Sequence, residues 1–352
     1  MEKAVQKTQT KESLAQRIKK NGISGSTIKI IAMVAMLIDH IGAFILEKII
    51  GINEMIDMEE GTEEYLRWMM KNYNLILFDN ILRLIGRIAF PIFCFLLVEG
   101  FFYTRSKQKY ALRLLFFGIL SEIPFDLAGY DTIFYSDYQN VYFTILLGFL
   151  AMWSLDFINK VDFKGVFWNI LSKLSFFIFG GFVWYILQGS ILSVVLDFLW
   201  PVRSREVWII GFYLQLPNLA NLIVYLCFGL ISLVVLCIVT RKFEKKDVTS
   251  FAIGLLPVYV IAYLGDVLHT DYGLVGVLTV VILYIFKKNK PRSMLWACGF
   301  LSFCNPMEIT AFADFGLLKI YNGKRGLKLK YVFYAFYPVH LLLLYFIGKC
   351  FI

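Results

Sequence analysis

Long apolar stretches recur along the chain and are separated by short polar or charged segments. A membrane-spanning helix needs about 20 mostly apolar residues, and residues 28–47 form the first such stretch. Comparable stretches follow at 80–103, 110–128, 140–158, 248–264, 272–286 and 331–350. The stretch 165–240 allows two or four crossings, and 293–320 is interrupted at Asn305-Pro306. The pattern predicts an all-α, polytopic transmembrane helix bundle of about eleven spans, within about nine to thirteen.

The composition agrees with a membrane protein. Of the 352 residues, 59% are hydrophobic and 17% are charged, whereas a soluble domain is usually about 45–50% apolar and about 25% charged. This balance excludes disordered, nucleic-acid-binding and secreted disulfide-rich proteins. The six cysteines stand singly inside apolar stretches, so we predict neither disulfides nor a metal site.

The net charge is +9, and the basic and acidic residues are distributed unequally between the two predicted sides of the membrane. Cytoplasmic segments of membrane proteins carry an excess of Lys and Arg, so segment 1–27, which is basic, is predicted to be cytoplasmic. Residues 51–74 are then an external loop, because six acids and no base lie between Glu54 and Glu64. A short surface helix is predicted around 65–73. Residues 28–352 are interpreted as a single transmembrane domain with its C-terminus outside.

Ionisable residues are costly inside a bilayer and need a partner or a function. The first span carries Asp39 and His40 about 16 Å along the helix from Lys29. The second carries Arg83 and Arg87, which are one helical turn apart and share a face. Counting from the outer end places Arg87 at about the depth of His40. We therefore predict a buried ion pair between Asp39 and one arginine.

The last span places His340 near the midplane, whereas His269 falls in a predicted external loop. An ordinary histidine pKa near 6.5 suits proton transfer at neutral pH. The candidate catalytic residues are His40, Asp39, Arg87, Arg83 and His340, with Glu99 and Tyr337 as lesser candidates. Two structural alternatives stay open: the histidines are satisfied core residues, and the ion pair only fastens helices together.

Other motifs carry less information. Asn140, Thr144 and Gly148 fall on one face of a predicted helix, which favours close helix packing over ligand contact. The motifs of soluble hydrolases, Walker-type nucleotidases and Rossmann dehydrogenases are absent from the sequence.

Several segments together resemble the TraX family. They are IKIIAMVAMLIDHIGA from Ile28, LRLIGRIAFPIFCFLLVEGFFYTRSKQKYALRLL from Leu82, SEIPFDL from Ser121, NVYFTILLG from Asn140 and YNGKRGLKLKYVFYAFYPVHLLLL from Tyr321. The resemblance covers the first 150 and the last 35 residues. It implies a pilin-acetylase-like protein within the wider group of transmembrane acyltransferases. Lys29 and His40 also reproduce the eleven-residue spacing of a basic residue and a histidine in glycan O-acetylating members.

The resemblance implies an integral membrane acyltransferase in a bacterial plasma membrane. It would move an acetyl group from cytosolic acetyl-CoA to an amine or hydroxyl acceptor, a pilin-like N-terminus or an envelope glycan, at the extracytoplasmic side. His40 would act as general base or carry the acyl group, Asp39 would orient it, and Arg87 with Arg83 would stabilise the oxyanion. His340 would be a partner of His40 or an acid.

Basic residues near the cytoplasmic ends of the spans are the candidates for binding the phosphates of CoA. They are Lys29, Arg105, Lys107, Lys109, Lys324 and Arg325. No metal and no nucleic acid are expected, and the expected partners are the lipid bilayer, acyl-CoA and the acceptor. Two alternatives remain: a transporter or flippase, which also uses buried charges in a proline-broken bundle, and a non-enzymatic component of pilus, conjugation or envelope assembly.

Overall fold

The computed structural model describes residues 22–52, 55, 58–59, 61–188, 219–242, 244–327 and 330–350. Most of the predicted N-terminal segment and the middle of the 165–240 stretch lie outside these residues. Most of the described residues are helical, and an isolated β-bridge joins Ile23 and Tyr321. The predicted all-α class is therefore confirmed.

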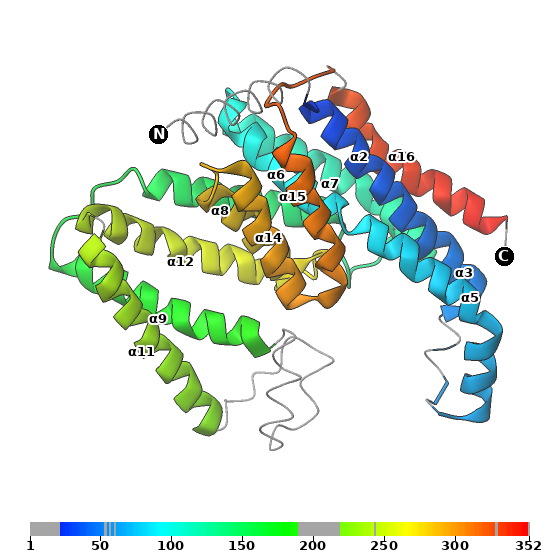
Figure 1. Ribbon diagram of the computed structural model, residues 1–352, viewed down its shortest axis with the longest axis horizontal. Helices are drawn as coiled ribbons and strands as arrows, with labels where there is room; N and C mark the ends of the chain where they lie inside the picture. The colour runs from blue at the N-terminus through cyan, green and yellow to red at the C-terminus, as the bar shows by residue number, and fades with distance from the viewer. Residues whose placement is uncertain are drawn as a thin grey trace, which may run out of the picture. The chain divides into compact units, whose positions relative to one another are not determined.

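The helices follow one another in the order shown in Figure 1. Their bounds are α2 (Gly25–Ile41), the π-helix η1 (Gly42–Leu46), α3 (Glu47–Ile50), α5 (Glu63–Gly86), α6 (Ala89–Tyr103), α7 (Lys107–Tyr130), α8 (Val141–Ile158), α9 (Val166–Gln188), α11 (Leu219–Lys242), α12 (Lys245–Val267), α13 (Gly273–Ile285), α14 (Lys290–Cys304), the 3₁₀ helix η3 (Pro306–Phe312), α15 (Ala313–Lys319) and α16 (Lys330–Lys349).

Six helical segments among the described residues are long and apolar enough to cross a membrane. They are Gly25–Ile50, Glu63–Tyr103, Val141–Ile158, Val166–Ile186, Lys246–Val267 and Tyr331–Lys349. The other expected crossings fall on the shorter apolar helices of α11 and α13, on the broken pair α14 and α15, and on α7, which carries three charged residues between 110 and 128. The protein is thus a helical membrane bundle.

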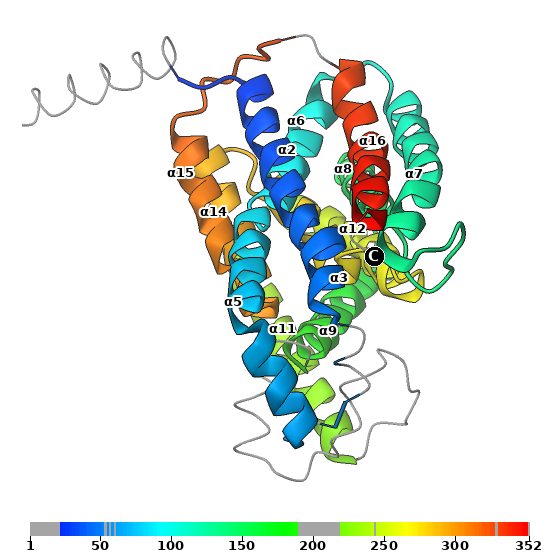
Figure 2. The same ribbon diagram turned by 90° about the vertical axis from the view of Figure 1, so that its right-hand side faces the viewer.

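The chain divides into two compact units. The first unit comprises the chain up to Tyr142, residues 282–299 and the part from Met307 onward. Within it, α2 packs against α5, α6 and α16, and α16 also packs against α7. Figure 2 shows α2 with α5 on one side and α16 on the other.

The second unit comprises 143–281 and 300–306, and it is held by close helix contacts. α9 packs against α11, and a Cβ at Gly180 would overlap the backbone of Phe228. Thr144 donates a hydrogen bond to the carbonyl of Asp271, and a Cβ at Gly148 would meet Val280 at 2.7 Å. These contacts confirm the helix-packing interpretation for this part of α8.

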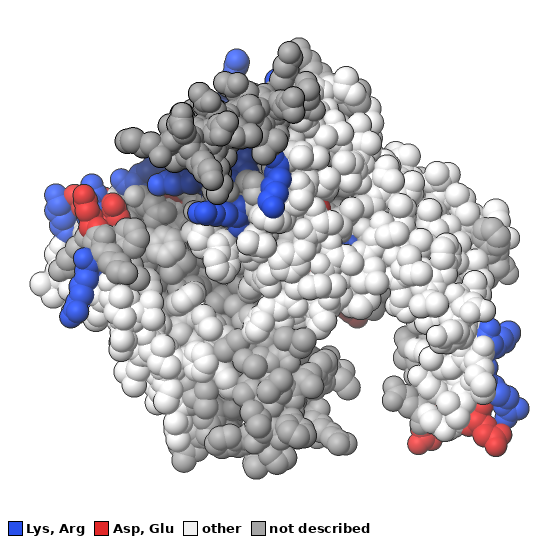
Figure 3. Space-filling view, in the orientation of Figure 1, with Lys and Arg blue, Asp and Glu red and all other residues white. Residues whose placement is uncertain are grey.

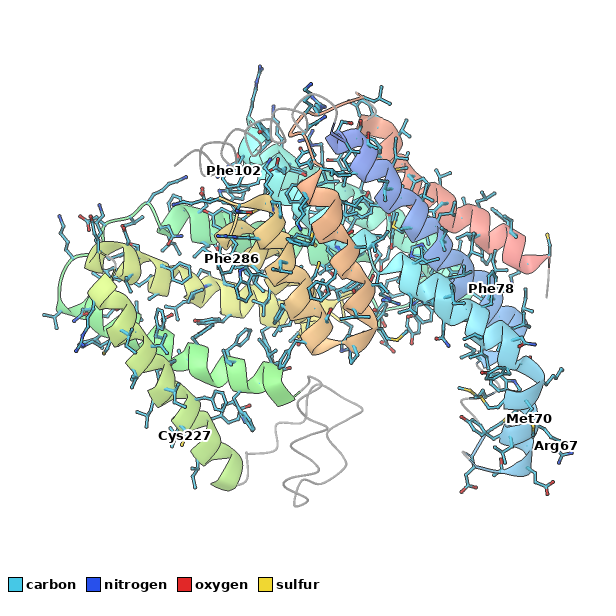
Figure 4. All side chains as sticks on the ribbon, viewed as in Figure 1. Arg67, Met70, Phe78, Phe102, Cys227 and Phe286 are labelled. Carbon is cyan, nitrogen blue, oxygen red and sulfur yellow. The ribbon has the colours of Figure 1, made fainter. Side chains whose placement is uncertain are left out.

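The prediction of a short surface helix at 65–73 followed by a separate span from residue 80 is wrong. One continuous helix, α5, runs from Glu63 to Gly86, and its N-terminus is capped by the Thr62 side chain. The helix ends because Pro91 has no N–H and its ring would clash with the carbonyl of Arg87 one turn earlier. Met70 and Phe78 are exposed along α5 (Figure 4).

On the surface of the first unit, two charged regions are separated by a region that carries almost no charge. In Figure 3, an almost uncharged surface over α2, α5 and α16 lies between blue side chains at the upper end and a mixed red and blue tip at the start of α5. Exposed apolar residues on these three helices include Val34 on α2, Ile81 on α5 and Val339 on α16. Such a surface is what a lipid environment requires.

Candidate functional site

Asp39 forms the centre of a partly buried ion-pair cluster. Its Oδ2 accepts a hydrogen bond from Arg83 Nη1 at 2.8 Å, and its Oδ1 lies 3.8 Å from Arg87 Nη2. The side chains of Asp39, Arg83 and Arg87 are 17%, 25% and 17% exposed. The predicted pairing of Asp39 with an arginine is therefore confirmed, and both arginines take part. Two cations beside one carboxylate leave positive charge to be balanced by other groups.

Three further acids lie beside the two arginines, and sequence reasoning missed all of them. Glu308 in η3 lies 3.3 Å from Arg87 Nη1, with only 3% of its side chain exposed. Glu47 Oε1 lies 3.9 Å from Arg83 Nε, and Asp79 is buried near Arg83. For two of these acids, the spacing in the sequence could have indicated a place in the cluster. Asp79 precedes Arg83 by one helical turn on α5, and Glu47 follows Asp39 by eight residues.

Helix distortions place these side chains. η1 begins directly after α2, and the Glu47 N–H bonds to the carbonyl of Gly42, so the first span widens just beyond His40. Such π-turns recur at functional sites. The break between α5 and α6 puts Arg87 at the end of its helix. Thr310 Oγ1 donates to the carbonyl of Leu84 at 2.6 Å, which fastens η3, and with it Glu308, to α5.

Gly86 lets α5 approach α2 at the ion pair, because a Cβ at this position would overlap the Asp39 side chain. We expect Gly86→Ala to lower the Tm of the purified protein, since overpacking costs about 1–3 kcal/mol. The control is Gly316→Ala in α15, where a Cβ meets nothing within 4 Å. Equal Tm values for the two variants would contradict the close approach at Gly86.

His40 and His340 form a hydrogen-bonded pair with nearly parallel rings. Their ring centroids are 4.9 Å apart, and His40 Nδ1 lies 2.7 Å from His340 Nε2. His340 Nδ1 lies 2.7 Å from the carbonyl of Phe336. Because a carbonyl only accepts, His340 Nδ1 carries a proton, and the Nε2 of neutral His340 accepts from His40 Nδ1–H. The remaining nitrogen of neutral His40, Nε2, then holds a lone pair.

This lone pair faces the ion-pair cluster. His40 Nε2 lies 4.0 Å from Asp39 Oδ2. The rings of Phe44 and Tyr337 lie 5.1 Å and 6.2 Å from the His40 ring and make its surroundings apolar. His40 is therefore a base with a defined tautomer, and its protonated form would be stabilised by the adjacent carboxylate. Tyr337 contributes to the walls of the site.

The six candidate CoA-binding residues gather at one end of the first unit. The N–H groups of Gly25 and Ser26 bond to the carbonyls of Lys324 and Arg325, so this basic loop sits on the start of α2. Lys29 lies over the ring of Phe333 at the start of α16. The others, Arg105, Lys107 and Lys109, lie where α6 ends and α7 begins.

The same end holds two lysines that sequence reasoning did not single out as binding residues. Lys290 Nζ lies 2.6 Å from Glu99 Oε2 and 4.9 Å from the Tyr321 ring. Lys287 Nζ lies 4.6 Å from the ring of Phe102, which is labelled in Figure 4. Glu99 is thus paired with a lysine at the basic end, which argues against a role for it beside His40.

Among the described residues there is no group of three or more His, Cys, Asp or Glu side chains that could hold a metal ion. The site combines a neutral imidazole base, a carboxylate that can stabilise its protonated form, and two guanidinium groups. This set can perform proton transfer and stabilise a developing anion.

The fold and the site define an integral membrane protein with a polar centre inside a helical bundle. The family model described as "TraX protein" matches residues 24–229 and 209–348. These matches cover most of the chain, and the protein belongs to the TraX family.

A relative from Dichelobacter nodosus is named "Probable fimbrial assembly protein FimC, serogroup H1". It is 24% identical over 330 residues, which cover 91% of this chain and 94% of the relative. No solved structure matches the chain.

Proposed function

We propose that the protein is a membrane acyltransferase that moves an acetyl group from acetyl-CoA to an amine or hydroxyl acceptor. The observation that carries this proposal is the His40–His340 pair, which leaves the His40 Nε2 lone pair beside Asp39 and both arginines. A base, its counter-ion and an anion-stabilising cation within one buried site are the groups that acyl transfer requires.

In this mechanism His40 Nε2 removes a proton from the attacking amine or hydroxyl, and a new C–N or C–O bond forms at the thioester carbon. Asp39 stabilises the imidazolium that results. The C–S bond then breaks, and His40 returns the proton to the departing thiolate, which gives free CoA thiol. His340 holds the His40 tautomer throughout, because its own Nδ1–H is bonded to the Phe336 carbonyl.

Arg87 stabilises the oxyanion that develops on the thioester oxygen. Its guanidinium is held between Asp39 and Glu308 and does not need to reorganise during the reaction. Arg83 is bonded to Asp39 more closely, so its role is to hold that carboxylate in place.

The basic end of the first unit would bind the phosphates of CoA. Lysine and arginine side chains at this end supply charge, and the rings of Phe102 and Tyr321 offer flat apolar surfaces beside them. The positive end would lie in the cytoplasm, as the distribution of basic residues predicts. The membrane would then be the plasma membrane of a bacterium, and the thioester would reach inward between α2, α5 and α16.

The acceptor would be a component of a pilus or another envelope structure. The TraX match and the fimbrial-assembly name of the relative support this assignment. A protein N-terminus and an envelope glycan are the two acceptor classes that we propose.

The test uses purified protein in sealed vesicles with acetyl-CoA labelled on the acetyl carbon. We expect the label to become covalently attached to an added pilin-type peptide or to a chitooligosaccharide, with release of one CoA thiol per transfer. Movement of the label across the membrane without covalent change would instead indicate a transporter. If neither labelling, thiol release nor movement occurs, the acyltransferase proposal is wrong and a structural role in assembly is favoured.

A further inference from the structure

Helix α5 extends past the end of the span on which it packs. The Asn72 side chain donates a hydrogen bond to the carbonyl of Ile50, the last residue of α3, so these two residues lie at the same level. The turns of α5 from Glu63 to Asn72 therefore project beyond the first span by about 13 Å, at a rise of about 1.5 Å per residue. Figures 1 and 2 both show α5 continuing past α3.

The projecting part of α5 lies in water. Glu63 and Arg67 form an ion pair there at 3.2 Å, and their side chains are 91% and 75% exposed. Glu64 and Lys71 are exposed on the same turns. Charged side chains at this density are too costly for the apolar layer of a bilayer, so that layer ends near Asn72.

One side of α5 carries a regular row of residues that the described part of the chain leaves exposed. We call them the α5 seam: Leu66, Met70, Tyr73, Leu77 and Asn80. They are spaced 4, 3, 4 and 3 residues apart, which places them on a single stripe of the helix. The four apolar members are 48–73% exposed, and Met70, labelled in Figure 4, is the most exposed of them.

The opposite face of α5 is already in contact with the bundle. Trp68, Asn72 and Asp79 are buried on that face, and α5 packs against α2 and α3. Apolar residues at the spacing of the seam are the pattern by which two helices pair, since each side chain fits between residues of the facing helix. Apolar side chains gathered on a surface in water mark an interaction site. The α5 seam is therefore a face for a partner helix.

Asn80 shows which helix fits. It lies eight residues past Asn72, about 12 Å further along α5, and therefore inside the apolar layer. It is exposed, and its side chain makes no hydrogen bond to the described residues. An amide without a partner is costly in lipid. Because an amide offers both an acceptor oxygen and a donor nitrogen, a second asparagine amide complements it fully.

A second copy of the chain can supply that amide. Two copies inserted in the same orientation are related by a two-fold axis normal to the membrane, so their α5 helices run parallel at the same level. Each residue of the α5 seam then faces its own counterpart, with the apolar members in contact and the two Asn80 amides side by side. Glu63 and Arg67 neutralise each other within each copy, so this ion pair brings no net charge to the contact.

We propose that the α5 seam is the contact between two copies of this chain, in which the two Asn80 side chains hydrogen-bond to each other inside the membrane. Asparagine side chains bond across membrane helices in this way, and a single asparagine in a seam of heptad spacing sets the register of the pair. The contact does not depend on the acyltransferase activity, and it is tested without that reaction.

The first experiment measures association of the full chain in phosphatidylcholine vesicles. Copies labelled at the N-terminus with a donor or an acceptor dye are mixed, and energy transfer is followed as the lipid-to-protein ratio changes. We expect a dimer whose affinity falls about 3–30-fold in Asn80→Leu, the range that a hydrogen bond between membrane helices contributes. Asn74→Leu is the matched control, because Asn74 is an exposed asparagine of α5 that lies off the seam. It should leave the affinity unchanged.

The second experiment maps the contact by disulfide cross-linking. The parent protein has its exposed cysteines Cys227, Cys237 and Cys350 replaced by serine. In this parent, Met70→Cys is expected to give a cross-linked dimer on oxidation with copper phenanthroline, because each residue 70 faces its counterpart. Lys71→Cys points away from the two-fold axis and should stay monomeric, like the parent.

Three results would overturn the inference. A wild-type chain that stays monomeric at every lipid-to-protein ratio would show that lipid covers the seam. An affinity unchanged by Asn80→Leu, or equal cross-linking of Met70→Cys and Lys71→Cys, would place the contact elsewhere. Cross-linking of Met70→Cys in bacterial membranes only to a different protein would assign the seam to that protein. The wild-type titration and the cysteine pair remain decisive where Asn80→Leu fails to fold.

Discussion

Replacing His40 with glutamine is expected to lower the rate of acetyl transfer by about 10²–10⁴-fold, the usual contribution of a general base. His40 Nε2 is the nitrogen whose lone pair faces the ion-pair cluster, and a glutamine amide cannot accept the acceptor's proton. Its N–H can still donate to His340 Nε2, so the local packing is largely kept. The measurement is label transfer from acetyl-CoA by protein whose Tm has been checked.

His269→Gln is the matched control, because His269 lies in the exposed turn between α12 and α13. We expect this variant to retain the wild-type rate. His340→Gln should cause a smaller loss than His40→Gln, since His340 acts through the tautomer of His40. If His40→Gln transfers acetyl at the wild-type rate with a lowered Tm, the histidine pair is part of the structural core and the catalytic assignment is wrong.

Replacing Arg87 with methionine is expected to lower both activity and stability. Loss of an oxyanion-stabilising group costs about 10²–10³-fold in kcat. The substitution also leaves Glu308 buried without its cation, and removing one partner of a buried pair costs about 3–5 kcal/mol. Asp39 is less affected, because Arg83 remains bonded to it. Steady-state rates and Tm values measure the two effects.

The double variant Arg87→Met with Glu308→Met separates catalysis from stability. Replacing a whole buried ion pair with apolar side chains is often neutral for stability, so Tm should recover towards the wild-type value. The activity should stay low, since the cation is still missing. Recovery of both Tm and rate in the double variant would show that Arg87 only fastens η3 to α5.

The sequence predicted much of the candidate site because intramembrane charges stand out against apolar segments. Asp39, His40, Arg83, Arg87 and His340 were identified in this way, and the structure brings all five together. Counting residues along the first two predicted spans placed Arg87 at about the same depth as His40, the neighbour of Asp39. This was enough to predict that Asp39 pairs with an arginine. Glu308 was missed because its segment is interrupted at Pro306, and a broken span gives no helical face from which to predict a direction.

Local backbone features were predicted less well than helices. The sequence indicated spans at 80–103 and 331–350, but it did not show that α5 begins at Glu63 or that Pro91 ends it near Arg87. Our interpretation limited the helix after Thr62 to residues 65–73 and began the span at residue 80, because the acidic segment 51–74 was assigned to an external loop. A capped helix that extends beyond the membrane tolerates such charges, because its polar side chains reach water.

The sequence alone determined that this is a membrane protein, that it is helical, and which residues need a polar partner inside the membrane. These follow from local properties, since an apolar segment that carries a charge can be recognised from the sequence before the partner of that charge is known. Only the tertiary structure decided which nitrogen of His40 is free, because that depends on His340 and Phe336, about 300 residues away. It also decided that Glu308 holds Arg87, since this depends on a contact between distant segments.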